Sequence, residues 1–301
     1  MIHGVMNVYK EKGYTSHDVV AKLRGILKQK KIGHTGTLDP DAQGVLPVCL
    51  GRATKLCDLL TDKNKTYRAV LLLGTVTDTQ DTSGKILEQR EVNVQEEEVR
   101  EAIHSFLGSY DQIPPMYSAL KVNGKKLYEL AREGKEVERK PRPVTIFEIQ
   151  IESVKLPKVE MTIRCSKGTY IRTLCHDIGE KLGCGGCMDQ LTRTRVGVFD
   201  AEESVRLSEI ERRAKEGSLG EIVTAIDQLF LEYREVTVKQ IYQKLLENGN
   251  PFMLDCLKET MDFKNQEQVR VYDERQTFYG IYQFEKERNG FWPVKIFFER
   301  G

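Results

Sequence analysis

Long apolar runs are missing from this 301-residue sequence, and no segment approaches the ~20 apolar residues that span a bilayer. The first residues do not combine a basic region with a long apolar core, so no secretory signal is predicted. Cysteine is scarce and odd in number, and its seven residues are scattered, which argues against a disulfide framework. We therefore expect a soluble cytoplasmic protein with no membrane partner.

An excess of charge of either sign is also missing, since the formal net charge is +1. Any binding of nucleic acid must therefore come from local basic patches. The sequence has no dinucleotide-binding glycine motif, no Walker loop and no complete set of metal ligands. One CxxC pair, Cys184 and Cys187, lacks the second pair that a structural zinc site needs. We predict neither a cofactor nor a metal.

The most informative stretch is GHTGTLDPDAQGVLP, from Gly33 to Pro47. Its glycines and prolines are incompatible with a regular helix or a central strand, so we expect a shaped loop. Pro40 restricts the backbone of Asp39 to extended conformations, which makes Asp39 a candidate catalytic carboxylate on a stiff loop. The alternative is a structural loop in which this aspartate caps its own backbone.

Hydrophobic periodicity predicts both strands and helices along the chain. Strands are expected at residues 1–9, 45–51, 66–74, 145–154, 159–165, 188–199, 268–272, 278–285 and 291–298. Helices are expected from a capping box at residues 15–18 onward and at 53–60, 93–107, 170–182 and 239–247. The strand at 66–74 is so apolar that we expect it to be buried on both faces for most of its length.

A basic segment, one arginine and one tyrosine suggest function by their placement. The segment from Lys121 to Arg142 has eight basic and four acidic residues, which suits contact with a phosphate backbone. A solvated surface helix would have the same charge pattern. Arg172 lies in the first turn of a predicted helix, where the helix dipole opposes a cation, so a partner carboxylate is expected unless it points to solvent. Tyr67 begins an apolar strand, where most tyrosines are ordinary core or edge aromatics.

The run GHTGTLDPDAQGVLPVCLG closely resembles the catalytic motif of the TruB-type tRNA pseudouridine synthases. The segments YKEKGYTSHDVVAKLR, TVTDTQDTSG and KGTYIR resemble further motifs of that family, in the same order. The resemblance covers nearly the whole chain. It implies an α+β fold with a mixed, largely antiparallel sheet flanked by helices in residues 1–230. It also implies an inserted thumb at about 117–145 and a small β-barrel, PUA-like RNA-binding domain at 231–301.

The resemblance also implies an activity and the residues that perform it. Members of the family convert the uridine at position 55, in the T loop of tRNA, to pseudouridine. The match assigns the catalytic carboxylate to Asp39, a tyrosine stacked under the target base to Tyr67, and the arginine that pairs with the carboxylate to Arg172. The partner would be the T-arm stem-loop of tRNA, bound by a monomer.

Further matched positions would bind the substrate. His34 would fill the space that the flipped base leaves, Asp81 would join the charge network, and Leu191 would pack against the base beside Arg193. His34 could instead be a hydrogen-bonded loop histidine, and Asp81 could form an Asx turn. The thumb would contact RNA through its basic residues, among them Lys125, Lys126 and Arg132.

Alternatives to this function remain on the sequence alone. The C-terminal segment is not basic, with eleven Lys and Arg against twelve Asp and Glu from Glu232 on, so a purely structural role would also fit it. The whole chain could be a non-catalytic RNA-binding or RNA-folding protein built on the same surfaces. An aspartate-nucleophile hydrolase is a third alternative, but it needs a water-activating base near Asp39 and leaves the basic segment unexplained.

Overall fold

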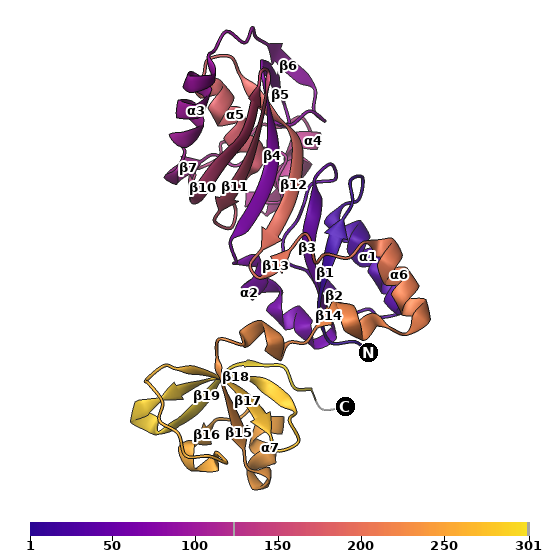
Figure 1. Cartoon of the computed structure of the whole chain (residues 1–301), viewed down its shortest axis with the longest axis vertical. Coiled ribbons are helices and arrows are strands. Elements are labelled where there is room, and N and C mark those ends of the chain that lie inside the picture. The colour runs from indigo at the N-terminus through magenta and orange to yellow at the C-terminus, as the bar shows by residue number, and fades with distance from the viewer. Residues whose placement is uncertain (123, 300–301) are drawn as a thin grey trace.

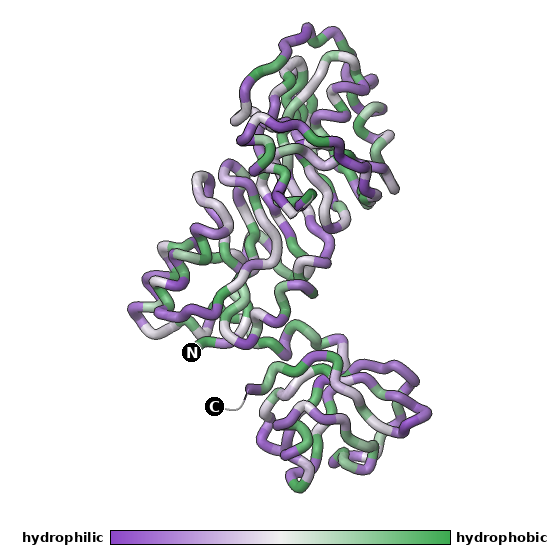
Figure 2. Tube along the Cα trace, turned by 180° about the vertical axis from the view of Figure 1, so that it is seen from behind, coloured by the Kyte–Doolittle hydropathy of each residue, from purple (hydrophilic) through white to green (hydrophobic). Residues whose placement is uncertain are grey.

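The computed structural model describes residues 1–122 and 124–299. The molecule is elongated, with a long twisted sheet and its helices above a smaller sheet that contains the C-terminal residues (Figure 1). Hydrophobic residues concentrate along the strands, and hydrophilic residues along the outer loops and helices (Figure 2). Within the described residues, no helix has both the length and the apolar character needed to cross a membrane.

The larger sheet is mixed and largely antiparallel, as predicted. Its order is β14-β1-β3-β12-β4-β11-β10-β7, with β13 beside β12 and β2 beside β3. The contact between β3 and β12 is parallel, and the other pairings of this sheet are antiparallel. The strands are β1 Gly4–Lys10, β2 Ile32–His34, β3 Gln43–Leu50, β4 Lys65–Leu73, β7 Gly108–Gln112, β10 Arg142–Lys155, β11 Lys158–Cys165, β12 Gly186–Val196, β13 Phe199–Asp200 and β14 Val223–Thr224.

Helices cover this sheet in two groups (Figure 1). The helices α1 (Ser16–Leu27) and α6 (Leu207–Glu216) lie beside β1 and β2, whereas α3 (Glu96–His104) and α5 (Ile171–Lys181) cover β4, β10 and β11. A 3-10 turn, η1 (Gly51–Leu56), leads into the short helix α2 (Cys57–Thr61). The capping box predicted at the start of α1 is present.

The prediction that residues 33–47 form one loop is wrong at both ends, because only residues 35–42 connect β2 to β3. Pro47 lies in the inner strand β3, where it is opposite Asn7. The Pro47 carbonyl accepts from the Thr35 N–H at 3.1 Å, so its ring nitrogen faces the same side. On that side Pro47 falls between the part of β3 that pairs with β12 and the part that pairs with β2. No ladder donor is needed there, which explains why proline is tolerated.

The prediction that residues 66–74 are buried on both faces is also wrong. Strand β4 alternates, with Tyr67, Ala69 and Leu71 buried and Arg68 exposed. One face of β4 packs under α5, and on the other face the residues besides Arg68 are half-buried. This second face holds only two aliphatic residues, Val70 and Leu72, so it is not the continuous apolar surface that burial on both faces requires.

Two short insertions project from the larger sheet. The hairpin of β5 (Thr75–Thr77) and β6 (Ile86–Gln89) follows β4 and carries a polar turn at residues 78–85. The thumb lies between β7 and β10 and contains β8 (Lys121–Val122), β9 (Lys125–Lys126) and the helix α4 (Leu127–Arg132). Arg172 contacts both insertions and also the loop at residues 35–42.

The smaller sheet curls around a core of its own. Its order is β15-β17-β18-β19-β16, with the bounds Arg234–Val238, Phe252–Met253, Gln268–Asp273, Phe278–Glu285 and Gly290–Ile296 for β15 to β19. The helix predicted at 239–247 is shorter, since η4 (Gln240–Tyr242) precedes α7 (Gln243–Glu247). Ile281 and Phe297 of this unit share a buried cluster with Val5 and Val45, so the two sheets pack against each other.

Candidate active site

The loop at residues 35–42 is held from beneath by Lys10, at the end of β1. Lys10 is fully buried, and its Nζ donates to the carbonyls of Pro40 at 3.1 Å and Ala42 at 2.5 Å. Both of these residues come just after Asp39 in the chain. Burial lowers the pKa of Lys10 to about 8, and the Asp39 carboxylate opposes this effect. Nothing in the local sequence distinguishes Lys10 from a surface lysine at a strand end.

Arg172, in the first turn of α5, connects this loop to both insertions. Its Nε lies 3.0 Å from Asp39 Oδ2, and its Nη1 lies 3.6 Å from Asp81 Oδ2 in the β5–β6 turn. Nη1 also donates to the Thr79 carbonyl, and Nη2 donates to the Tyr117 carbonyl at the base of the thumb, both at 3.0 Å. The partner carboxylate that the helix dipole required is thus present, and a second carboxylate shares the guanidinium.

The surroundings of Asp39 have opposing effects on its charge. Burial raises the pKa of Asp39 above its usual value, and the nearby Asp81 raises it further. Arg172 and Lys10 lower the pKa of the same carboxyl. The charged form of Asp39 is therefore favoured by two neighbouring cations and opposed by burial and by Asp81.

Tyr67 and Leu191 complete the floor of the site. Tyr67 on β4 is opposite Arg193 on β12, and both side chains are buried. Leu191, two residues before Arg193, is in the same apolar cluster as Tyr67 and Leu38 of the loop. Burial raises the pKa of Tyr67, while Arg193 beside its hydroxyl acts in the opposite direction. The structure thus brings Asp39, Tyr67, Leu191 and Arg193 together from distant parts of the chain.

His34 lies at the end of β2, just before the loop. Its ring packs edge to face against His17 of α1, with ring centres 5.3 Å apart. Burial, His17 and Arg193 lower the pKa of His34 to about 4, so it is neutral at physiological pH. A hollow of about 510 Å³ opens beside it, between α1 and β2. A neutral imidazole at the edge of a hollow can occupy space without introducing charge.

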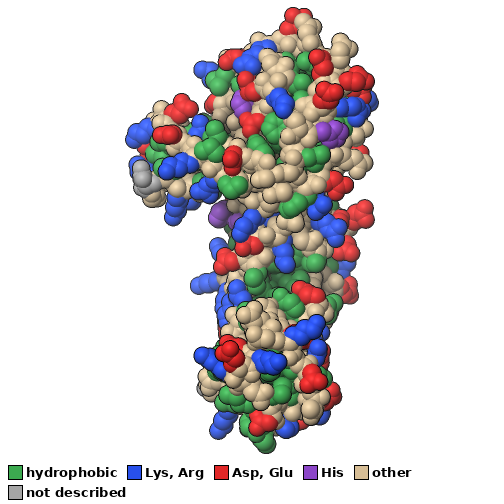
Figure 3. All heavy atoms as spheres, turned by 90° about the vertical axis from the view of Figure 1, so that its left-hand side faces the viewer, with side chains coloured by type: hydrophobic (Ala, Val, Ile, Leu, Met, Phe, Trp, Pro, Cys, Tyr) green, Lys and Arg blue, Asp and Glu red, His purple; other side chains and the backbone are tan. Residues whose placement is uncertain are grey.

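The thumb residues lie apart from this cluster. Lys126 and Arg132 flank the ring of Tyr128, at 5.3 and 5.5 Å from its centre. Lys125 is exposed and lies 3.5 Å from Glu133. Within the part of the chain that the structure describes, these cations form no ion pair with Asp39 or Asp81. Figure 3 shows Lys and Arg side chains gathered on a projecting part of the surface.

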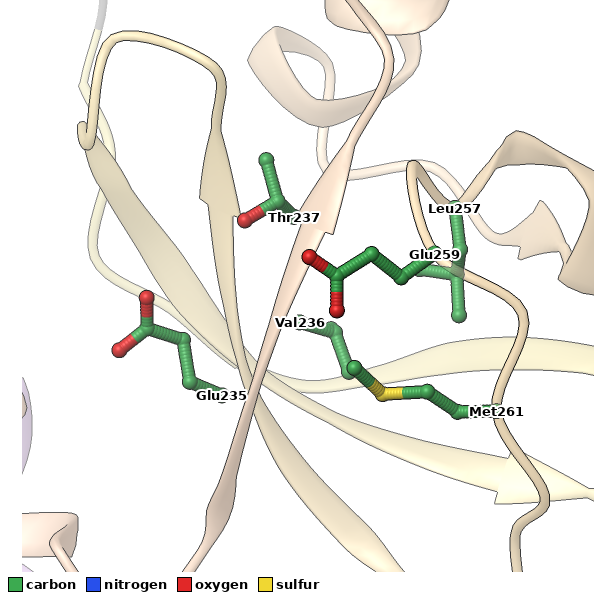
Figure 4. Close-up of a pocket in the computed structure, with 6 residues that line it drawn as sticks. All are labelled: Glu235, Val236, Thr237, Leu257, Glu259 and Met261. Atoms are coloured by element: carbon green, nitrogen blue, oxygen red, sulfur yellow. The ribbon is translucent and has the colours of Figure 1, made fainter.

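Another hollow lies in the smaller sheet, and none of the candidate residues lines it. It has a volume of about 160 Å³ and is lined by Glu235, Val236, Thr237, Leu257, Glu259 and Met261 (Figure 4). Two acidic side chains at its edge make it unsuited to a phosphate group. Across residues 1–122 and 124–299, no group of three or more His, Cys, Asp or Glu side chains could hold a metal ion.

Comparisons with known proteins connect this geometry to an enzyme class. Residues 24–171 match a model described as TruB family pseudouridylate synthase (N terminal domain). Residues 172–231 match a model described as tRNA pseudouridylate synthase B C-terminal domain. The chain is 55% identical to tRNA pseudouridine synthase B of Lachnoclostridium phytofermentans, over 98% of this chain and 100% of that relative. It is 46% identical to the protein of the same name from Alkaliphilus oremlandii, over 99% and 100%.

Solved structures support the same assignment at the level of the fold. One chain in a crystal structure of a Cbf5-Nop10-Gar1 complex is 25% identical, with a TM-score of 0.73 over 99% of this chain and 86% of that chain. The fold and the arginine-paired aspartate, taken with the sequence matches, define a pseudouridine synthase, which is an isomerase. The chain belongs to the TruB family of pseudouridylate synthases.

Proposed function

We propose that this enzyme converts the uridine at position 55 in the T loop of tRNA to pseudouridine, without a cofactor. The full-length relatives, which are named tRNA pseudouridine synthase B, support tRNA as the substrate. The observation that carries the proposal is the Asp39–Arg172 pair on a rigid loop above a buried tyrosine. A carboxylate held in this way is suited to act on a base or sugar that is brought to it.

The reaction rearranges bonds within one nucleotide. The glycosidic C–N bond breaks, the free uracil rotates, and a C–C bond forms to the same sugar carbon, so no electrons or groups leave. Ionised Asp39 attacks the sugar or base carbon or removes a sugar proton, and all three routes need its negative charge. Arg172 keeps that charge and fixes the direction of the carboxylate. Tyr67 stacks on the uracil and assists the loss of the C5 proton at the end.

Access to the base requires that it leave the folded loop of the RNA. Flipping costs a few kcal/mol, so the enzyme must replace the lost stacking contacts. In our proposal Leu191 packs against the flipped base, and neutral His34 fills the space that the base leaves. Asp81 holds Arg172 in place from the opposite side. The thumb contacts the phosphate backbone through the cations Lys125, Lys126 and Arg132, so recognition follows the shape of the T arm.

The remaining features of the proposal concern the whole chain. We place the catalytic domain at residues 1–230, with the thumb at about 117–145, and a PUA-like RNA-binding domain at 231–301. We further propose that the enzyme acts as a monomer in the cytoplasm. The seven cysteines, none of which is in a disulfide in the structure, are compatible with that compartment.

The proposal is tested with a T-arm RNA hairpin, followed by mapping of the modified position. We expect pseudouridine at the position equivalent to 55, and loss of the activity in Asp39→Asn, because the amide can neither carry the charge nor act as nucleophile or base. Asp41→Asn is the matched control, since Asp41 lies on the same loop and its side chain is 56% exposed. Wild-type rates in Asp39→Asn, or modification at another position, would overturn the proposal.

A further inference from the structure

Arg193 is a buried cation whose surroundings differ from those of the other site arginine. It is the largest fully buried side chain in the described residues, at 1% exposure. Arg172 is buried to a similar degree but faces two carboxylates. Arg193 has no carboxylate among the groups that act on its pKa, which burial lowers and Tyr67 raises. Buried guanidinium groups normally have an anionic partner, so this exception calls for an explanation.

The guanidinium of Arg193 contacts backbone on both sides of the loop that carries Asp39. Its Nη2 donates to the Gly36 carbonyl at 3.2 Å, within that loop. Its Nε donates to the Val45 carbonyl at 2.8 Å, on β3 just after the loop. Two carbonyls therefore stand in for the missing anion, one inside the loop and one on the strand that follows it.

A glycine allows the backbone of β3 to come close to Arg193. Gly44 is opposite Arg193 in the parallel pairing of β3 with β12, and its φ is +107°. A Cβ atom at Gly44 would overlap the backbone of Arg193, so no other residue fits. The sequence thus brings the start of β3 unusually close to this arginine.

Tyr67 is the third group beside this guanidinium. It is opposite Arg193 across β4 and β12, and Arg193 lowers the pKa of its phenol. A guanidinium can only donate, so we expect the phenol oxygen to accept from Arg193 and the Tyr67 O–H to point elsewhere. The Asp39 carboxylate raises the pKa of Tyr67, so it also acts on this phenol.

We propose that Arg193 is a positioning residue for this reaction. It ties the Asp39 loop to the Tyr67 phenol and directs the Tyr67 O–H away from the sheet, toward the reacting uracil. The charge on Arg193 also favours the ionised phenol, because it opposes the effect of burial. This inference rests on the proposed function of Asp39 and Tyr67 and adds a residue that touches neither base nor sugar.

The test compares Arg193→Met and Arg193→Lys with Arg195→Met, an exposed arginine on the same strand. Single-turnover rates with saturating T-arm RNA, RNA affinity and the pH–rate profile are measured for each variant. For Arg193→Met we expect a rate about 100-fold lower with unchanged affinity, because the loop and phenol lose their common anchor. The fall of the rate at alkaline pH should move to higher pH, since loss of the Arg193 cation raises the pKa of Tyr67.

Arg193→Lys retains the charge but cannot reach two carbonyls and a phenol together. It should keep the alkaline limb near that of the wild type and recover only part of the rate. Wild-type rate and pH profile in folded Arg193→Met would overturn the inference, as would a loss confined to RNA affinity. Tyr67→Phe provides a check that does not depend on folding of the Arg193 variants. It should lower the melting temperature by removing the acceptor, and an unchanged melting temperature would also overturn the inference.

Failure of the inference and failure of the proposed function are distinguishable. If Asp39→Asn stays active, the proposed function is wrong whatever the Arg193 variants do. If Asp39→Asn and Tyr67→Phe are inactive while Arg193→Met keeps the rate and pH profile of the wild type, only the role of Arg193 is wrong.

Discussion

The Asp39–Arg172–Asp81 cluster and the thumb are both charged, but their surroundings are opposite. The Arg172 side chain is 6% exposed, and backbone carbonyls hold it between two carboxylates. The Lys125 side chain is 59% exposed, and its Nζ lies 3.5 Å from a carboxylate oxygen of Glu133. Buried charges interact strongly because little solvent screens them, whereas exposed charges are screened within about 10 Å at 0.1 M salt. The comparison predicts that the cluster controls the rate and its pH dependence, while the thumb controls affinity and its salt dependence.

Among the groups around Asp39, the largest effect is expected from Arg172→Met. Removing this guanidinium leaves two carboxylates near each other without a cation between them, and it frees the loop that carries Asp39. The single-turnover rate with saturating T-arm RNA should fall about 100-fold or more. Because Arg172 lowers the pKa of Asp39, its loss raises that pKa further, so the acid limb of the rate profile should move to higher pH.

Arg100→Met is the control for this experiment. Arg100 lies on α3 and pairs with Glu96 at the surface, so its loss should change neither the rate nor the profile. An acid limb that stays in place in Arg172→Met would mean that the buried cluster does not control ionisation of the catalytic carboxylate.

A smaller effect, with a pH shift of the opposite sign, is expected from Asp81→Asn. Asp81 raises the pKa of Asp39, so its neutralisation should move the acid limb to lower pH. The rate at neutral pH should fall about tenfold, because an amide holds Arg172 less firmly. Asp78→Asn is the control in the same turn, since Asp78 accepts from the Lys85 N–H and does not face Arg172. A shift of the Asp81→Asn limb to higher pH would contradict the electrostatic account.

Local sequence rules were sufficient for several parts of the structure. The capping box predicted the start of α1, and alternation predicted β17 and β18 within a residue at each end. The position of Arg172 at a helix N-terminus predicted a carboxylate partner, since a cation there is unfavourable without one. Each of these features depends on interactions within a few residues along the chain or on one strong electrostatic conflict.

Other parts could not be read from local pattern, because they depend on contacts between distant segments. Pro47 fits an inner strand only because β2 and β12 leave a gap beside it. Lys10 and Arg193 look like surface cations until the loop at residues 35–42 folds over them. The roles of the candidate site residues likewise came from the resemblance and are still to be tested by experiment.

In contrast to the buried cluster, the thumb should control RNA affinity and its salt dependence. Replacing Lys125, Lys126 and Arg132 with alanine should weaken binding of T-arm RNA, and the slope of log affinity against log salt should become shallower by about two. The rate at saturating RNA should stay near wild type, because these side chains are outside the buried cluster. Binding and single-turnover measurements over a salt series check both expectations.

The matched control for the thumb is a triple alanine variant of Arg68, Lys158 and Arg164. These cations each pair with an acidic residue on or beside strands of the larger sheet. The variant has the same change in net charge, so it separates a local contact from a general electrostatic effect. If the salt slope of the thumb variant equals that of the wild type, its cations are only a solvated surface.

The smallest effect is expected where an exposed charge lies between the two sheets. Lys31 and Glu299 are 2.9 Å apart, and their side chains are 42% and 44% exposed. Lys31→Met should change the free energy of unfolding by less than about 1 kcal/mol, with a difference that fades as salt increases. Phe297→Ala at the same boundary removes a side chain that is 1% exposed and should cost about 3–5 kcal/mol. A loss from Lys31→Met as large as that from Phe297→Ala would mean that exposure does not separate weak from strong contributions to stability here. The division between a buried cluster for chemistry and an exposed thumb for capture would then lose its physical basis.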